Sequence, residues 1–154
     1  MKTFNFATEI WLAAPRDLFE FFADPSNLER LTPPWLRFEI ITPPDTVITR
    51  GTLLDYRLRL HGIPLLWQSE ISIWDPPRRF VDRQTKGPYS LWVHEHRFAD
   101  KDNGTLVGDK LEYAMLGGQL AQKFFVAPDL ERIFQYRHRV LEELCNPDKR
   151  AATP

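Results

Sequence analysis

The sequence contains a single cysteine, Cys145, and only four histidines among its 154 residues. One cysteine excludes an intrachain disulfide framework and any zinc site built from several cysteines. Lys and Arg total 20 and Asp and Glu total 21, which leaves a formal net charge of -1. The chain therefore lacks the basic excess with which proteins bind nucleic acids or anionic membrane surfaces, and we expect no nucleic-acid partner.

Long apolar runs are also missing. No stretch approaches the ~20 residues that a membrane-spanning helix needs, so stable membrane insertion is not expected. The opening MKTFNFATEIWLAAP does not have the order of a signal peptide, because Asn5, Thr8 and Glu9 interrupt its apolar positions. We therefore expect a cytoplasmic protein. Its length suits one domain, predicted over residues 1–147, with a frayed polar tail at 148–154.

Proline and large aromatic residues are plentiful, with 13 Pro, 5 Trp and 11 Phe. The prolines predict where elements end. Residues 4–12 alternate between apolar and polar positions, which is typical of a half-buried strand. Two short helices are predicted next, one from Pro15 to Ala23 and one that Asp24 caps and Thr32-Pro33-Pro34 stops.

The middle of the chain consists of alternating runs separated by short turns, which predicts an antiparallel meander. The predicted strands cover residues 38–42, 52–60, 65–73, 79–85, 89–98 and 105–115. After Gly117-Gly118 we expect a short helical segment at 119–126, an interruption at Ala127-Pro128-Asp129, and a long helix over 128–144.

This order predicts an α+β fold in which a curved, seven-stranded antiparallel sheet wraps around a long C-terminal helix, with two short helices after the first strand. Three segments also carry a family resemblance: WLAAPRDLFEFFADPSNLERLTPPWLRFEI, IWDPPRRFVDRQTKGPYSLWVHEHRF and GTLVGDKLEY. The first resembles the opening of the START-like, helix-grip superfamily, which includes polyketide cyclases, lipid-transfer domains and birch-pollen-allergen-like proteins. The other two are similar to bacterial SRPBCC, or cyclase/dehydrase-like, members. The resemblance implies the helix-grip fold and supplies no shared catalytic motif.

Polar residues are predicted on the buried faces of two strands. His94 and His96 share a face with Trp92 and Phe98, and Asp109 lies on the apolar face of the next strand. A loop over residues 99–104 pairs Phe98 with Thr105 and places His94 opposite Asp109, whereas a slip of two residues places His96 there.

An arginine is predicted on the buried face of the long helix. With about 100° per residue, Arg137 falls at the centre of the stripe formed by Leu130, Ile133, Phe134, Val140, Leu141 and Leu144. A guanidinium there needs an acceptor, so we predict a hydrogen-bonded ion pair with Asp109 first and Asp82 second, with His94 bound to the same carboxylate.

These residues define the candidate site and leave several functions open. The expected ligand-binding residues are Tyr56, Trp67, Asp82, Trp92, His94, His96, Tyr113 and Arg137. We predict binding of a small, largely apolar or amphipathic molecule of lipid, polyketide or aromatic type. The alternatives are a cyclase or dehydratase that uses His94 and Asp109, an interaction module with a closed cavity, and a purely structural polar network.

Two weaker patterns in the sequence concern a metal ion and a protein partner. His94-x-His96 with Asp109 as a third ligand suggests zinc, but Arg137 would compete for that carboxylate, so we expect no metal and no cofactor. Segment 117–127 carries Leu120, Phe124, Phe125 and Val126, and it fits the core of its own domain, a lid or a homodimer contact.

Overall fold

The computed structural model describes residues 2–14 and 18–145. A seven-stranded antiparallel sheet has the order β1-β7-β6-β5-β4-β3-β2. Its strands are β1 (Phe4–Leu12), β2 (Glu39–Ile40), β3 (Leu53–Leu60), β4 (Ile63–Asp75), β5 (Arg79–Lys86), β6 (Leu91–Lys101) and β7 (Gly104–Ala114). The helical elements are α1 (Leu18–Ala23), α2 (Ser26–Leu31), η1 (Pro34–Leu36), α3 (Gly118–Ala121), η2 (Gln122–Val126) and α4 (Ala127–Cys145). The predicted tail at 148–154 lies outside the described residues.

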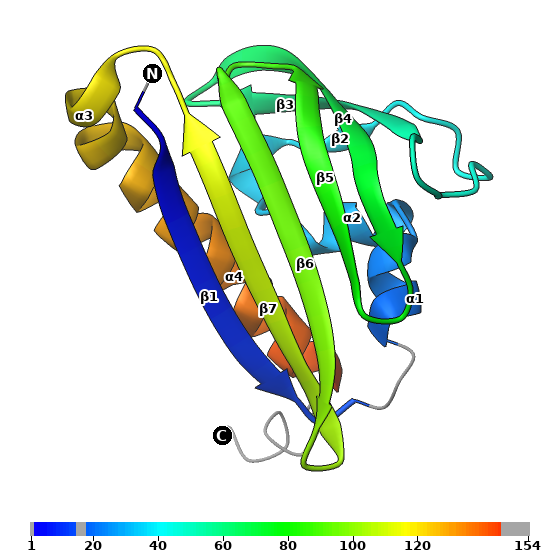
Figure 1. The fold of residues 1–154 in the computed structure, drawn as a ribbon. Coiled ribbons are helices and arrows are strands. Elements are labelled where there is room, and N and C mark those ends of the chain that lie inside the picture. Colours follow the sequence, from blue (N-terminus) through cyan, green and yellow to red (C-terminus); the bar gives the residue numbers. More distant parts are fainter. Residues whose placement is uncertain (1, 15–17, 146–154) are drawn as a thin grey trace.

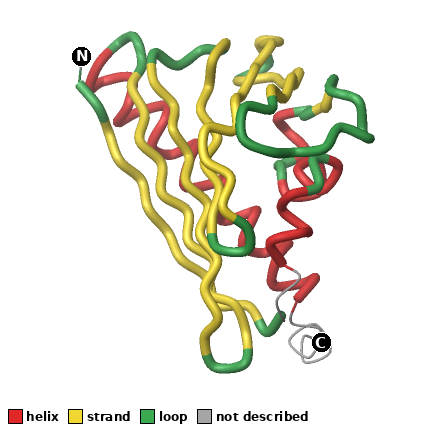
Figure 2. Tube along the Cα trace, turned by 45° about the vertical axis from the view of Figure 1, so that its right-hand side comes forward, coloured by secondary structure: helices red, strands yellow, loops and turns green. Residues whose placement is uncertain are grey.

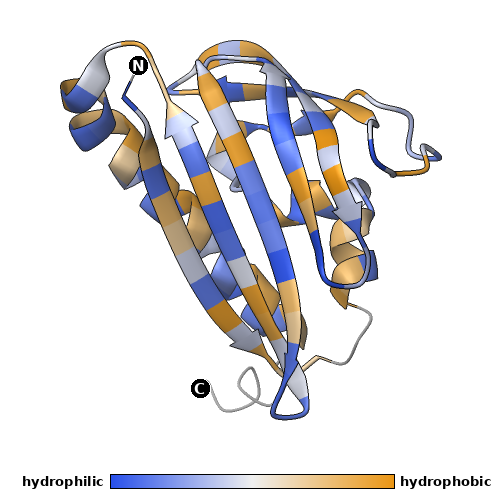
Figure 3. Ribbon diagram, in the orientation of Figure 1, coloured by the Kyte–Doolittle hydropathy of each residue, from blue (hydrophilic) through white to orange (hydrophobic). Residues whose placement is uncertain are grey.

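The helices lie on one side of the curved sheet, and α4 runs along it behind β1, β7 and β6 (Figures 1 and 2). Figure 3 shows the alternating hydropathy along these strands that buries one face and exposes the other. The predicted α+β helix-grip fold, with two short helices after the first strand, is therefore confirmed. Within the described residues, no helix is both long and apolar enough to cross a membrane.

The turn between β6 and β7 is shorter than the loop over residues 99–104 that the first of the two predicted registers required. Asp102 and Asn103 both adopt positive φ, at 49° and 61°, and Lys101 pairs with Gly104. Two left-handed residues form the two-residue turn whose twist matches a β-hairpin. Phe98 consequently pairs with Val107 rather than Thr105, and His96, not His94, lies opposite Asp109.

The predicted interruption before the long helix is wrong. Helical backbone continues from Gly118 to Cys145, with a π-helical turn at η2 in which the Ala127 N–H binds the carbonyl of Gln122. Pro128 follows this wider turn directly. The chain therefore accommodates the proline by a local change of helical pairing instead of a break.

The predicted strand at 38–42 is also shortened, to the two residues of β2. Both Ile41 and Thr42 direct their N–H groups to one carbonyl, that of Asp55, at 2.8 and 3.4 Å. The Thr42 hydroxyl in turn accepts the Asp55 N–H at 2.7 Å. This shared pairing ends the regular ladder, because each residue of a strand needs its own partner.

Two apolar clusters hold the helices against the sheet. The larger joins α1 and α2 to the inner faces of β3–β7 through residues such as Phe19, Phe22, Leu54, Phe98 and Leu141. The smaller one, composed of Leu111, Tyr113, Leu130 and Phe134, lies between β7 and the first half of α4. Between the two clusters, Asp82 of β5, His94 and His96 of β6 and Asp109 of β7 lie on the face of the sheet that α4 covers.

Candidate ligand-binding site

A cavity of about 190 Å³ lies between the sheet, α2, η1 and α4. Most of its wall is apolar and comes from Leu28, Leu31, Leu36, Phe38, Leu58, Leu60, Leu130, Ile133 and Phe134. The predicted Tyr56, Trp67, Asp82, Trp92, His94, His96 and Arg137 all line it as well. The curved sheet and a single helix therefore leave space between them, as their geometry suggested.

Tyr113 does not line the cavity, contrary to its place among the predicted ligand-binding residues. Its ring packs in the smaller cluster, 5.7 Å from that of Phe4, and its hydroxyl accepts a hydrogen bond from the Gln122 side chain at 3.3 Å. The facing pattern of β7 was correct, since Tyr113 is buried, but its position beside β1 directs it into packed core.

Tyr89 lines the cavity although sequence patterning did not select it. The alternation of the predicted strand placed it on the outer face, but β6 begins only at Leu91. The Gln84 side chain binds both the N–H and the carbonyl of Tyr89, at 3.2 and 2.7 Å, and holds its backbone outside the ladder. Its ring then packs against Trp67 and Trp92, with centroid separations of 5.7 and 4.7 Å.

The polar wall of the cavity consists of two crossed histidine–carboxylate pairs. His94 lies across the strands from Asp82, yet its Nε2 donates to Oδ1 of Asp109 at 2.7 Å. His96 lies opposite Asp109, yet its Nε2 donates to Oδ2 of Asp82 at 2.7 Å. The two imidazole rings pass beside each other, with centroids 3.8 Å apart. The predicted His94–Asp109 contact therefore forms diagonally across the sheet.

Both carboxylates are ionised. Burial alone would raise the pKa of Asp109, but the Arg137 charge, the His94 hydrogen bond and the two imidazoles together lower it below its usual value. Burial alone would also raise the pKa of Asp82, but the hydrogen bond from His96 and the positive charges nearby lower it below its usual value. The cluster therefore retains two negative charges at neutral pH.

His96 is neutral and has a defined tautomer. Burial, and then the charge of His94, lower its pKa to about 4, although the Asp82 hydrogen bond opposes the shift. Its Nε2 carries the hydrogen that Asp82 accepts, so Nδ1 accepts from Nη2 of Arg137 at 3.3 Å. The imidazole thus connects a carboxylate to the guanidinium.

Arg137 is buried in the middle of α4, at 8% exposure, as its position in the apolar stripe predicted. Its Nη2 lies 3.6 Å from Oδ1 of Asp109, which makes an ion pair but not the predicted direct hydrogen bond. The guanidinium packs over the rings of Phe22 and Phe134, at 5.0 and 5.9 Å. Arg137 Nε and Asp109 Oδ2 are buried and make no hydrogen bond within the described part of the chain.

A second hollow of about 240 Å³ adjoins the cavity and shares Leu36, Leu60, Asp129 and Ile133 with it. Trp35 and Arg132 form one side, and the β3–β4 turn at His61-Gly62 forms the other. Nε2 of His61 lies 2.7 Å from Oδ2 of Asp129 and connects this turn to α4. We call this hollow the outer recess; sequence patterning did not find it, since its residues come from η1, the β3–β4 hairpin and the first turns of α4, which are far apart in the sequence.

Val126 packs against the smaller cluster, but the other large apolar side chains of segment 117–127 are not part of the core. Leu120, Phe124 and Phe125 are exposed at 71%, 62% and 61%, and the preceding Leu116 is exposed as well. This outcome removes the first of the three alternatives for the segment. A lid or a homodimer contact stays a prediction.

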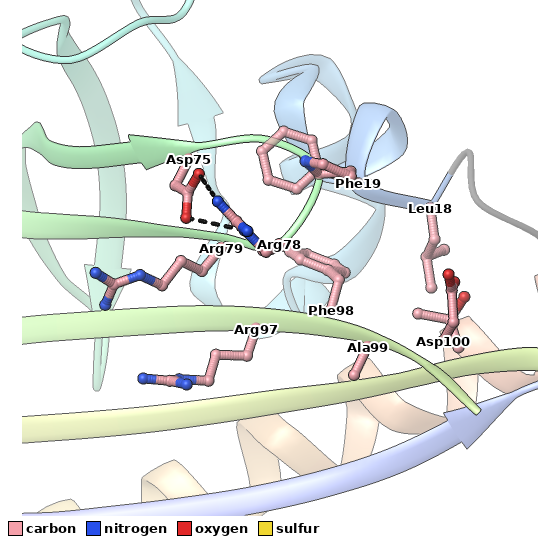
Figure 4. A pocket seen from close by; sticks show the side chains of 11 residues that line it. Leu18, Phe19, Asp75, Arg78, Arg79, Arg97, Phe98, Ala99 and Asp100 are labelled. Atoms are coloured by element: carbon pink, nitrogen blue, oxygen red, sulfur yellow. Dashed lines mark hydrogen bonds and ion pairs between the residues drawn. The ribbon is translucent and has the colours of Figure 1, made fainter.

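Another hollow, of about 590 Å³, lies at the opposite end of the sheet beside α1 and the β4–β5 turn (Figure 4). Its charged groups already have protein partners. Arg78 binds Asp75 at 3.0 Å, and Arg79 and Arg97 both bind Glu95, at 2.9 and 2.6 Å. This end therefore has the paired, solvated charges expected of an outer surface, and the central cavity is the better candidate site.

A curved antiparallel sheet around one long helix, with a cavity between them, defines the helix-grip fold. The chain belongs to the polyketide cyclase / dehydrase and lipid transport family, whose model matches residues 13–135. Comparison with curated protein sequences gave no match.

Solved structures share the fold at low sequence identity. The Zhui aromatase/cyclase from Streptomyces sp. R1128 is 18% identical, with a TM-score of 0.72 over 99% of each chain. Major latex-like protein 151 from Panax ginseng is 13% identical, with a TM-score of 0.69 over 93% of this chain and 97% of that one. Protein Ms6760 from Mycobacterium smegmatis is 17% identical, with a TM-score of 0.68 over 94% and 92% of the two chains.

Proposed function

We propose that this protein binds a small, largely apolar molecule with one polar end in the central cavity. The observation that carries the proposal is the distribution of polarity in the cavity wall. Leucine and aromatic side chains surround most of the space, and Arg137, His94 and His96 come together on one side of it. Small-molecule sites have this composition: a mostly apolar surface with a few polar groups that orient the ligand.

The volume limits the ligand. A cavity of about 150 Å³ lined by apolar side chains is known to hold benzene. On that scale, 190 Å³ accommodates one substituted ring or a short acyl chain. A longer molecule of the lipid or polyketide type needs the adjoining outer recess as well, and it would pass the His61–Asp129 contact at the junction.

The charges favour a neutral polar end. Asp82 and Asp109 are both ionised and lie beside this wall, so an anionic ligand would be repelled by two carboxylates. Arg137 Nε is a buried donor that has no acceptor among the residues that the structure describes. A ketone or phenol oxygen satisfies it without a second negative charge, which would recover the free energy lost by leaving a buried donor unpaired.

Native mass spectrometry of freshly purified protein is the first test, because a retained molecule would be detected and its mass measured. Titration with 4-hydroxyacetophenone and with benzoate, followed by tryptophan fluorescence, then compares a neutral with an anionic single ring. We expect saturable quenching with the ketone through Trp67 and Trp92, and at least tenfold weaker binding of benzoate. Equal or stronger binding of benzoate would contradict the neutral-end assignment.

A cavity-filling variant tests the location. Leu58→Phe adds volume at a buried position on the cavity wall, and Leu66→Phe makes the same change at a position of β4 that is 67% exposed. We expect the first to abolish or greatly weaken ketone binding and the second to leave it unchanged. Thermal unfolding of both variants confirms that the fold is retained, since overpacking costs roughly 1–3 kcal/mol. Unchanged binding by Leu58→Phe would place the ligand elsewhere.

An enzyme of cyclase or dehydratase type is the second candidate, and the His94–Asp109 pair favours it. A buried carboxylate that accepts the Nε2–H of His94 leaves Nδ1 free to take up a proton, which is the arrangement of an oriented general base. Binding without turnover predicts that His94→Ala weakens ligand retention modestly. Turnover of a β-hydroxyketone by the purified protein, lost in His94→Ala, would replace the binding proposal with the enzymatic one.

A further inference from the structure

We propose that Asp82, His94 and His96 form a binding site for a divalent transition-metal ion of the zinc type. One donor atom from each of the three residues lies within 4.8 Å of the other two. Asp82 comes from β5 and both histidines come from β6, so two hydrogen-bonded strands position the whole set. All three side chains line the central cavity.

The carboxylate of this site is Asp82 and not Asp109. The sequence suggested Asp109 as the third ligand, and Arg137 was expected to compete for it. In the structure, Arg137 pairs with Asp109, while Asp82 lies beside Nδ1 of His94 and Nε2 of His96. The competition therefore leaves the donor set of Asp82 and the two histidines intact.

His94 already has the orientation of a metal ligand. Its Nε2–H is donated to the buried Asp109, so the lone pair of the neutral ring is on Nδ1, which lies 3.9 Å from Oδ2 of Asp82. Metal-binding histidines usually donate their second N–H to a carboxylate or carbonyl in this way, because the contact fixes both tautomer and ring orientation.

His96 reaches the same arrangement by moving one proton. Its Nδ1 lies 3.5 Å from Oδ1 of Asp109, so the other neutral tautomer donates Nδ1–H to Asp109 and leaves Nε2 as the ligand nitrogen. Arg137 would then lose its contact with Nδ1. Its unpaired Nε and the unpaired Oδ2 of Asp109 provide an alternative pairing for the two groups. Asp109 thus supports both histidines from behind.

The spacing of the donors requires only small side-chain movements. Zinc–nitrogen and zinc–oxygen distances of about 2.0 Å in tetrahedral geometry place ligand atoms about 3.3 Å apart. His96 Nε2 and Asp82 Oδ2 are 2.7 Å apart, and His94 Nδ1 and Asp82 Oδ2 are 3.9 Å apart. Each separation therefore changes by about 0.6 Å.

The chemistry of the donor set favours a transition-metal ion. Two nitrogens and one oxygen suit Zn²⁺ or Co²⁺, whereas Mg²⁺ and Ca²⁺ prefer oxygen ligands alone. Because the set has three members, a fourth coordination position would face the cavity.

The experiment uses metal only, so its outcome does not depend on the proposed organic ligand. Protein treated with a chelator is titrated with Zn²⁺ by calorimetry, and with Mg²⁺ as a comparison. We expect one zinc per chain and no magnesium. Asp109→Asn should weaken zinc binding by 10–100-fold, the usual cost of losing such a supporting contact. Asp82→Asn removes a ligand itself and should weaken binding further.

His61→Gln is the matched control. His61 also lies beside a carboxylate, Asp129, but on the exposed β3–β4 turn, and this variant should still bind one zinc. No binding by the wild-type protein, undiminished binding by Asp82→Asn, or loss of binding by His61→Gln would each overturn the proposal. If Asp82→Asn does not fold, X-ray absorption of the zinc-loaded wild-type protein decides: two imidazoles are expected, and one or none refutes the site.

Discussion

The pair formed by Arg137 and Asp109 is expected to couple the long helix to the sheet. Arg137→Met keeps the length and apolar packing of the side chain over Phe22 and Phe134 but removes the charge. At 3.6 Å and an effective dielectric constant of about 20, the lost attraction is roughly 5 kcal/mol before desolvation is considered. The hydrogen bond from His94 remains to stabilise Asp109, so we expect a net loss of about 3 kcal/mol, at the lower end for a broken buried pair.

A double-mutant cycle isolates the interaction. Asp109→Asn alone leaves the guanidinium buried beside His96, and it should also cost about 3 kcal/mol. Arg137→Met with Asp109→Asn removes both charges. The double variant should therefore lose about 2 kcal/mol less stability than the two single losses added together. Urea unfolding of the four proteins measures each free energy. Effects that add to within about 0.5 kcal/mol would refute the coupling, and Arg137 would then be an anchor for ligand alone.

Three further outcomes are expected. Burial lowers the pKa of His96 in the folded protein to about 4, below the ~6.5 of an unfolded histidine. Between these two values the unfolded chain binds more protons than the folded one, so the free energy of unfolding should decrease as the pH is lowered from ~6.5 to about 4. His96→Gln should flatten this dependence in thermal melts, and an unchanged slope would contradict the assignment. Gly104→Ala should destabilise the protein by roughly 1–3 kcal/mol, since a Cβ there would clash with the carbonyl of Leu12. Denaturant unfolding with no loss of stability would refute the close contact. Asp24→Ala removes the carboxylate that accepts the Ser26 N–H at the start of α2 and should cost about 1 kcal/mol, while Asp24→Asn, an equally good cap, should cost little.

Local patterns in the chain determined the fold class and most of the candidate residues. Alternating polarity identified six of the strands at nearly full length, and the prolines marked the short helices between β1 and β2. The helical period alone placed Arg137 on the buried face, and strand alternation alone placed His94, His96 and Asp109 inside. These inferences succeeded because the direction of a side chain depends on the backbone period of its own element.

Relations between elements were decided only by the tertiary structure. The tight Asp102-Asn103 turn selected the second register, and the side chains then paired diagonally, so His94 rather than the opposing His96 donates to Asp109. The two hydrogen bonds between the Gln84 side chain and the Tyr89 backbone direct the Tyr89 ring into the cavity. The position of β7 beside β1 keeps the Tyr113 ring out of it. Each of these outcomes depends on the turn geometry and on which neighbour supplies a hydrogen-bond partner, and the period of a single strand contains neither.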